Sequence, residues 1–200
     1  MLGAYALKHA PGTCVEYSNV GFALLGLALA HRANKSYEEL LVERICDPLG
    51  LFNTRITLTP DMRSRIAQGH NSNLERRPLW DLPTLAGAGA VRSTANDLTV
   101  FLEACLGRRQ TSLRPALAKL LTVRKPTTEG GIEVALGWLI SSGHDDEIVW
   151  KDGGSGGFGT FVGFSPVTRQ GSIVLSNAAN WRYLDDIGMH LINSDFPLLK

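Results

Sequence analysis

The fold of this chain is decided by the segment from Trp150 to Asn177, WKDGGSGGFGTFVGFSPVTRQGSIVLSN. Short β-branched or aromatic runs alternate in it with clusters of glycine, proline and serine, a pattern typical of strands joined by tight turns. The runs IEVALGWLI (132–140) and EIVWKDG (147–153) extend the pattern upstream. We therefore predict four short antiparallel strands, with a hairpin turn at SPVTRQG.

Upstream of the strands, apolar residues recur mostly at helical spacing, over about residues 20–121. The segment SYEELLVERICDPLGL (36–51) has Ser36 and Glu39 at the spacing of a reciprocal capping box, and a proline and a glycine mark its end. We predict a helix over this segment.

Two further helices follow from similar signals. STANDLTVFLEACLGRR (93–109) has Ser93 or Thr94 as its N-cap and an aspartate in its first turn, where a carboxylate suits the helix dipole. WRYLDDIGMHLI (181–192) returns to helical spacing after the strands and is expected to cover one face of the sheet. Residues 59–91 are polar and interrupted by proline and glycine, which predicts a long surface excursion with short elements.

These patterns predict the α+β class, with a mainly helical region over about residues 17–125. Antiparallel strands and a C-terminal helix are expected over about residues 131–200. The 200 residues, 44% of them hydrophobic, suffice for the core of one domain. Lysine and arginine (20) nearly balance aspartate and glutamate (19), and no basic run could follow a phosphate backbone, so nucleic acid is not an expected partner.

Other sequence signals point to no cofactor and no membrane span. Cys14, Cys46 and Cys105 are odd in number and widely spaced, so we expect three buried thiols rather than disulfides or a metal site. No apolar run reaches the roughly 18 residues that cross a bilayer. The first ten residues lack the charged start and apolar block of a secretory signal.

The glycine-rich stretch KDGGSGGFG (151–159) is the first candidate for a site, because glycine lets a ligand or a second backbone approach a strand edge. A flexible hairpin is the alternative. Gly153 to Gly157 formally match the G-x-S-x-G nucleophile elbow around Ser155, but that elbow leads from a strand into a helix and here a strand follows. The order of a phosphate-binding P-loop is also absent.

Taken together, the motifs resemble the serine β-lactamase and penicillin-binding-protein superfamily, closest to its class C β-lactamase, D,D-carboxypeptidase and family VIII esterase branch. Agreement runs from about residue 11 to residue 195, so the resemblance implies a single partial domain of that fold over residues 1–200. The segments that carry it are PGTCVEYSNVGFALLG (11–26), DPLGLFNTRITL (47–58), AGAVRSTANDLTVFLEACL (88–106) and WKDGGSGGFGTFVGFSPVTRQGSIVLSNAAN (150–180).

The resemblance implies an acyl hydrolase site and no cofactor. Tyr17 would move the proton of the attacking hydroxyl, and Lys151 would stabilise its phenolate. Asn19 would hold the amide carbonyl of the substrate. The remaining predicted substrate-binding residues lie on the glycine-rich strand, where the backbone N–H of Gly154 would form half of an oxyanion hole: Asp152, Gly153, Gly154 and Ser155.

Without the resemblance, the same residues have structural explanations. Asn19 would be the N-cap of the helix that follows, Tyr17 a core or staple residue, and Lys151 a solvated charge on a strand.

Two departures from the family pattern qualify the expectation. No serine in the sequence has a lysine three residues later, so the S-x-x-K nucleophile is missing, and Thr122 to Lys125 is only a chance near match. Asp152 stands where β-lactamases have threonine, and its charge should repel an anionic substrate.

We therefore expect a truncated serine hydrolase for β-lactams, esters or D-amino-acid peptides, inactive alone. The alternatives are a non-catalytic remnant that binds a ligand or partner, and one half of a two-chain enzyme. An unpaired sheet edge and an exposed apolar face are expected, covered by self-association or by a companion N-terminal segment.

Overall fold

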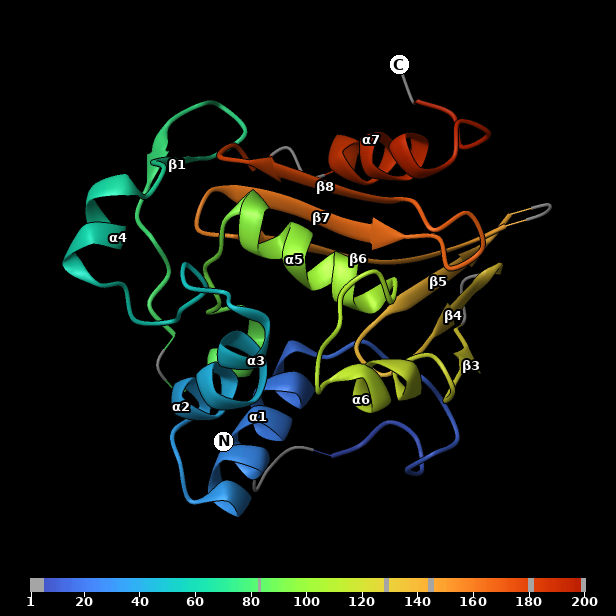
Figure 1. Ribbon diagram of the computed structural model, residues 1–200, viewed down its shortest axis with the longest axis horizontal. Helices are drawn as coiled ribbons and strands as arrows, with labels where there is room; N and C mark the ends of the chain where they lie inside the picture. Colours follow the sequence, from blue (N-terminus) through green and yellow to red (C-terminus); the bar gives the residue numbers. More distant parts are fainter. Residues whose placement is uncertain (1–5, 83, 128–129, 144–145, 180–181, 199–200) are drawn as a thin grey trace.

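The computed structural model describes residues 6–82, 84–127, 130–143, 146–179 and 182–198. Its centre is an antiparallel sheet of six strands in the order β3-β4-β5-β6-β7-β8, with helices on both faces (Figure 1). The strands are β3 (Lys125–Pro126), β4 (Ile132–Val134), β5 (Leu139–Ser142), β6 (Glu147–Ser155), β7 (Phe158–Phe164) and β8 (Gly171–Ser176).

The predicted strand at 132–140 is wrong as a single element. The structure divides it into β4 and β5, because Gly137 has a φ of 85° and turns the chain between them. β3 is an additional short strand that the sequence pattern did not indicate. The prediction of a turn at SPVTRQG is confirmed, since β7 and β8 pair directly on either side of it.

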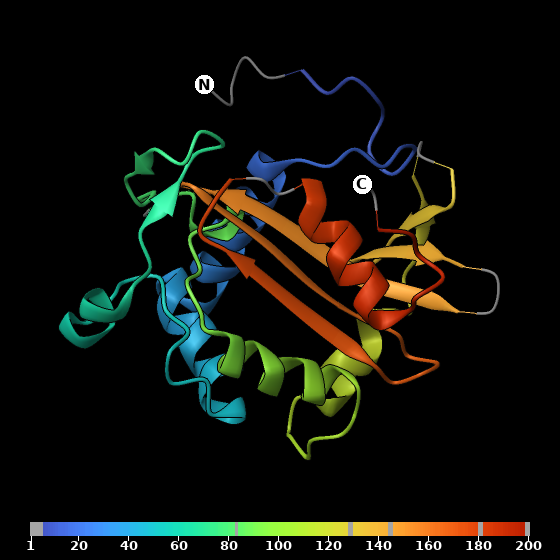
Figure 2. The same cartoon turned by 90° about the horizontal axis from the view of Figure 1, so that it is seen from above.

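Helix α7 (Arg182–Ile192) covers one face of the sheet, as Figure 2 shows from above. Its predicted first residue, Trp181, lies outside the described residues. The apolar side chains between helix and sheet form one buried cluster, made of Ile148, Phe161, Leu184, Met189 and Ile192. Helix α7 therefore packs on the part of this face formed by β6, β7 and β8.

Helix α5 (Ala95–Cys105) lies across the opposite face, against β7 and β8 (Figure 1). Its Leu102 joins a buried cluster with Trp138 and Phe164, whose rings meet edge to face at 5.5 Å. Thr94 is the N-cap, since its side chain accepts a hydrogen bond from the N–H of Asp97. The structure thus selects Thr94 over Ser93.

The helix predicted from residue 36 is confirmed at its start, where Ser36 and Glu39 form both bonds of a capping box. Its interior differs from the prediction, because a π-helical turn separates two short α-helices before Gly50 ends the run in a left-handed conformation. The three parts are α2 (Tyr37–Leu41), η2 (Val42–Cys46) and α3 (Asp47–Leu49).

Helix α1 (Asn19–Ala33) begins the helical half, and its cap corrects the structural explanation offered for Asn19. Ser18 is the N-cap, because its side chain accepts from the N–H of Gly21. The helix packs on α2 and on a short 3₁₀ turn, η3 (Ala86–Ala88). Gly87 allows this close approach, since a Cβ there would lie 2.6 Å from the carbonyl oxygen of Phe22.

The excursion over residues 59–91 contains short elements, as expected. They are α4 (Pro60–Arg65), β1 (Gly69–His70) and β2 (Arg76–Arg77), and helix α6 (Arg114–Lys119) follows α5. None of the helices in the described ranges is both long and apolar enough to cross a membrane. The expectation of three buried thiols is wrong for Cys14, which is exposed on the segment before α1.

Candidate active site

Tyr17 and Asn19 flank the capping residue of α1, so the start of one helix fixes both side chains. The Tyr17 hydroxyl donates to Oδ1 of Asn19 at 3.0 Å. This bond leaves the Asn19 NH₂ group free to donate to another carbonyl. Tyr17 is 60% exposed, and its ring leans on Phe22 at 5.9 Å between centroids. The phenol therefore faces an open surface.

Lys151 comes from the middle of β6, where the sheet leaves an edge open. β5 pairs with β6 only up to Trp150, whereas β7 pairs with it as far as Ser155. Among the described residues, residues 151–155 have no strand on their second side. Backbone groups on such an edge are available to a ligand.

The structure brings Tyr17 and Lys151 together across 134 positions of the sequence. Nζ of Lys151 lies 4.8 Å from the centroid of the Tyr17 ring, within the range of a cation–π contact. Because Tyr17 also bonds Asn19, the three predicted residues form one group beside the open edge of β6.

A carboxyl cluster adjoins this group on the other side of β6. Nζ of Lys151 donates to Oδ1 of Asp152 at 2.9 Å and to its carbonyl oxygen at 3.1 Å. Behind them, burial raises the pKa of Asp185 on α7 to about 6, and the carboxylates of Asp152 and Asp186 act in the same direction. Oδ1 of Asp185 is buried with no hydrogen-bond partner among the described residues.

The glycine-rich turn between β6 and β7 has a structural role as well. Gly156 and Gly157 have φ angles of 52° and 86°. A Cβ on Gly157 would lie 2.6 Å from the backbone nitrogen of His70. The second glycine therefore lets β1 pack on the turn, and His70 N–H donates to the Gly157 carbonyl. Gly153 and Gly154 lie on the open stretch of β6.

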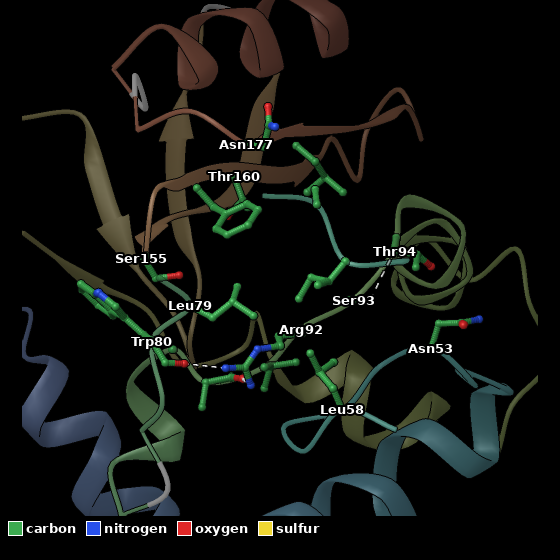
Figure 3. Close-up of a pocket in the computed structure, with 18 of the residues that line it drawn as sticks. Asn53, Leu58, Leu79, Trp80, Arg92, Ser93, Thr94, Ser155, Thr160 and Asn177 are labelled. Atoms are coloured by element: carbon green, nitrogen blue, oxygen red, sulfur yellow. Dashed lines mark hydrogen bonds between the residues drawn. The ribbon is translucent and has the colours of Figure 1, made fainter. Parts of the chain in front are cut away.

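A cavity of about 630 Å³ continues from this strand along the face of the sheet that is turned to α5 (Figure 3). Directly paired residues share a face, so Lys151 lies on the same side as Val162, which lines the cavity. Most of its walls are apolar. The labelled lining residues in Figure 3 are Asn53, Leu58, Leu79, Trp80, Arg92, Ser93, Thr94, Ser155, Thr160 and Asn177.

Hydrogen bonds fix the wall of the cavity that lies opposite the sheet. Oδ2 of Asp97 accepts from the Thr54 hydroxyl at 2.7 Å and from the N–H of Asn53 at 2.9 Å. The Arg92 guanidinium donates to the carbonyl oxygens of Trp80 and Ile56. These bonds hold two loops that are distant in sequence against the start of α5.

The predicted site residues thus fall into two places. Tyr17, Asn19, Lys151 and Asp152 converge, whereas Ser155 lines the cavity farther along β6. Sequence reasoning missed Asp185 and the cavity residues Trp80, Arg92 and Asn177. Only Asn177 had a usable signal, as the last residue of the strand run SIVLSN.

Comparisons with known proteins agree on one family. The model of the family described as "Beta-lactamase" matches residues 1–191. The D-alanyl-D-alanine-carboxypeptidase/endopeptidase AmpH of Escherichia coli K12 is 30% identical over 189 residues, which cover 87% of this chain and 48% of that protein. The unguisins hydrolase ungD' of Aspergillus campestris is 33% identical over 188 residues, covering 84% of this chain and 35% of its own length.

Solved structures show the same fold. A class C beta-lactamase superposes with a TM-score of 0.86 at 21% identity and covers all of this chain. A beta-lactamase/D-alanine carboxypeptidase from Pseudomonas syringae gives 0.83 at 24% identity over 96% of the chain. This chain spans 62% of each of these two structures and less than half of either curated relative.

Proposed function

The chain belongs to the beta-lactamase family, and on that premise we propose that it forms the proton-transfer and substrate-edge part of a serine acyl hydrolase. The observation that carries the proposal is the convergence of Tyr17, Asn19 and Lys151 beside an unpaired stretch of strand. Acyl transfer to serine needs a base, a carbonyl-binding group and an oxyanion site. Tyr17 with Lys151 would supply the first, Asn19 the second, and the backbone N–H of Gly154 on the unpaired stretch the third.

In the proposed reaction, a serine oxygen attacks the acyl carbonyl of the substrate while Tyr17, as phenolate, takes the hydroxyl proton. The positive charge of Lys151 favours the phenolate, because an opposite charge nearby stabilises the ionised form. The Asn19 amide holds the acyl side chain, and the Gly154 N–H on the open edge receives the oxyanion. The tetrahedral intermediate then breaks the bond to the alcohol or amine, which leaves with the proton from Tyr17. Water next attacks the acyl-enzyme and gives a proton to Tyr17, which passes it to the serine oxygen as the acid product leaves.

The serine must come from a segment that these 200 residues do not include, because no S-x-x-K occurs in the sequence. We propose that this segment seats in the cavity along the sheet. The cavity is apolar, lies on the same face as Lys151 and begins at Ser155 of the glycine-rich strand. An apolar helix entering there would bury its side chains and place a hydroxyl near the open edge.

The substrate class is proposed as neutral esters or amides in preference to carboxylate-bearing β-lactams. Asp152 places a negative charge beside Lys151, and Asp185 and Asp186 follow on α7. A substrate carboxylate approaching this edge would meet repulsion instead of a free cation.

The test is reconstitution with the segment encoded directly upstream, or by a neighbouring gene, that carries an S-x-x-K motif. We expect hydrolysis of p-nitrophenyl butyrate to exceed that of nitrocefin, and labelling of the new serine by a fluorophosphonate. Tyr17→Phe and Lys151→Met should each lower kcat/KM at least about 100-fold, in line with the loss of acid–base catalysis. Lys119→Met, an exposed lysine on α6, is the matched control and should leave kcat/KM unchanged.

Labelling of a serine within the 200 residues themselves would overturn the proposal that the nucleophile comes from outside. A reconstituted pair that binds but neither hydrolyses esters nor reacts with the fluorophosphonate would instead favour a non-catalytic binding role.

A further inference from the structure

The ammonium of Lys151 lies between two groups that compete for its charge. Asp152 receives two hydrogen bonds from Nζ, through its carboxylate and its carbonyl oxygen, and the Tyr17 ring lies 4.8 Å away. In the described part of the chain, no hydrogen bond joins Nζ to the Tyr17 hydroxyl. That hydroxyl donates to Asn19 instead.

The contact between Lys151 and Asp152 is unusual, because neighbours on a strand point to opposite faces. Lys151 pairs with Val162, on the side of α5, whereas Asp152 pairs with the buried Phe161, on the side of α7. Their polar ends meet because β6 has an open edge at these positions. About 30% of each side chain is exposed, so the pair is only partly screened by water.

Helix α7 places more negative charge behind Asp152. Asp185 and Asp186 follow one another in its first turns, and Asp152 contributes to the raised pKa of Asp185. The carboxylate of Asp152, which accepts a hydrogen bond from Nζ, directs the Coulombic pull on the ammonium away from the phenol oxygen.

We propose that Asp152 is a positioning residue for Lys151, which holds the ammonium against the face of the Tyr17 ring and withholds it from the phenol oxygen. A phenolate forms more readily when an ammonium lies at its oxygen. Asp152 therefore keeps the Lys151 ammonium away from the phenol oxygen until a ligand or segment entering at the open edge displaces the Asp152 carboxylate. The inference rests on the proposed role of Tyr17, but its test measures the position of Lys151 and does not need turnover.

The experiment is proton NMR of the full chain, with the methylene protons next to Nζ of Lys151 as the probe. The Tyr17 ring should shift them upfield relative to a Tyr17→Leu reference, which lacks the ring. We expect Asp152→Asn to reduce this ring-current shift at least about twofold, because the lost charge releases the ammonium. The phenolate absorbance of Tyr17 should then appear at lower pH than in the unsubstituted chain.

Asp185→Asn is the matched control, since it removes a nearby carboxylate that makes no hydrogen bond to Lys151. It should leave the ring-current shift unchanged. Asp152→Ser serves as a second variant if Asp152→Asn folds poorly. An unchanged shift in both Asp152 variants, or an equal loss in Asp185→Asn, would overturn the inference. If the proposed hydrolase function is wrong but this inference is right, the reconstituted protein will not hydrolyse esters, while the ring-current shift will still depend on Asp152.

Discussion

Helices α7 and α1 bury opposite kinds of residue. α7 turns large apolar side chains, Leu184, Met189 and Ile192, toward the sheet. The buried residues of α1 are small: Ala23, Gly26 and Ala30. All the large apolar residues of α1 except the half-buried Phe22 are exposed instead, and they are Val20, Leu24, Leu25, Leu27 and Leu29.

The difference shows which of the two helices has its large apolar side chains covered. An amphipathic helix such as α7 needs one partner, and the sheet provides it. A helix that is apolar on most sides is typical of a position buried all round. The small residues of α1 let it approach η3 closely, while its outward leucines form an exposed apolar surface on this helix, not on the sheet where the sequence predicted one.

The largest expected effect on stability comes from replacing a glycine in helix α7. A Cβ on Gly188 of α7 would overlap the ring of Phe161, which is fully buried and has no room to move. We expect Gly188→Ala to lower the free energy of unfolding by about 1–3 kcal/mol through overpacking. Urea unfolding measures this change.

Gly26→Ala on α1 is the matched control. Its Cβ would come 3.1 Å from the half-buried Tyr37 ring and 3.4 Å from Cα of Gly87, contacts that a shift of a few tenths of an ångström would relieve. Alanine also gains up to about 1 kcal/mol of helix propensity, so the two effects should nearly cancel. An equal loss for both glycines would contradict the contrast between the two helices.

Asp185 on α7 gives a smaller effect on folding stability, and this effect depends on pH. The pKa of Asp185 is raised to about 6, first by burial and then by neighbouring carboxylates, so its charged form is disfavoured in the folded chain. Folding stability should therefore fall as pH rises from about 4 to 6. Asp185→Asn should raise the free energy of unfolding by up to about 1 kcal/mol at pH 8, after allowance for solvent screening, and by nothing near pH 3.

Asp195→Asn, at an exposed position beyond α7, is the control for this pH dependence. Its effect on urea unfolding should be the same at both pH values. A gain for Asp185→Asn that persists at pH 3 would show that the cause is packing and not charge.

The outward leucines of α1 give the smallest effect on stability but a clear one on association. Leu25 and Leu29 lie one turn apart and are 53% and 47% exposed. Replacing both by glutamine should change the free energy of unfolding by less than about 0.5 kcal/mol, as is usual for surface sites. We expect the unsubstituted chain to self-associate as its concentration rises, and sedimentation velocity should show that the double substitution abolishes this association.

Val167→Gln, in the exposed turn between β7 and β8, should leave the association unchanged. An unsubstituted chain that stays monomeric at every concentration would contradict the prediction that the exposed leucines of α1 mediate self-association.

Local signals in the sequence were enough for much of the fold. The capping box at Ser36 and Glu39 depends on two side chains three positions apart, and it formed as expected. The turn between β7 and β8 follows from residues adjacent in the chain. The capping residue of α1 was misassigned to Asn19, because Ser18 and Asn19 are both good caps and only the path of the chain selects one.

The arrangement of the site residues depended more on tertiary structure than the helices and turns did. The sequence determined that Tyr17, Asn19 and Lys151 were candidates, through motifs that resemble a family. It also determined that the S-x-x-K motif is missing. Only the tertiary structure decided that the Lys151 ammonium lies on the Tyr17 ring and that Asp152 holds it there. The reason is that β5 begins at Leu139, opposite Trp150, which leaves an open edge beyond Trp150 where side chains from both faces of β6 can meet.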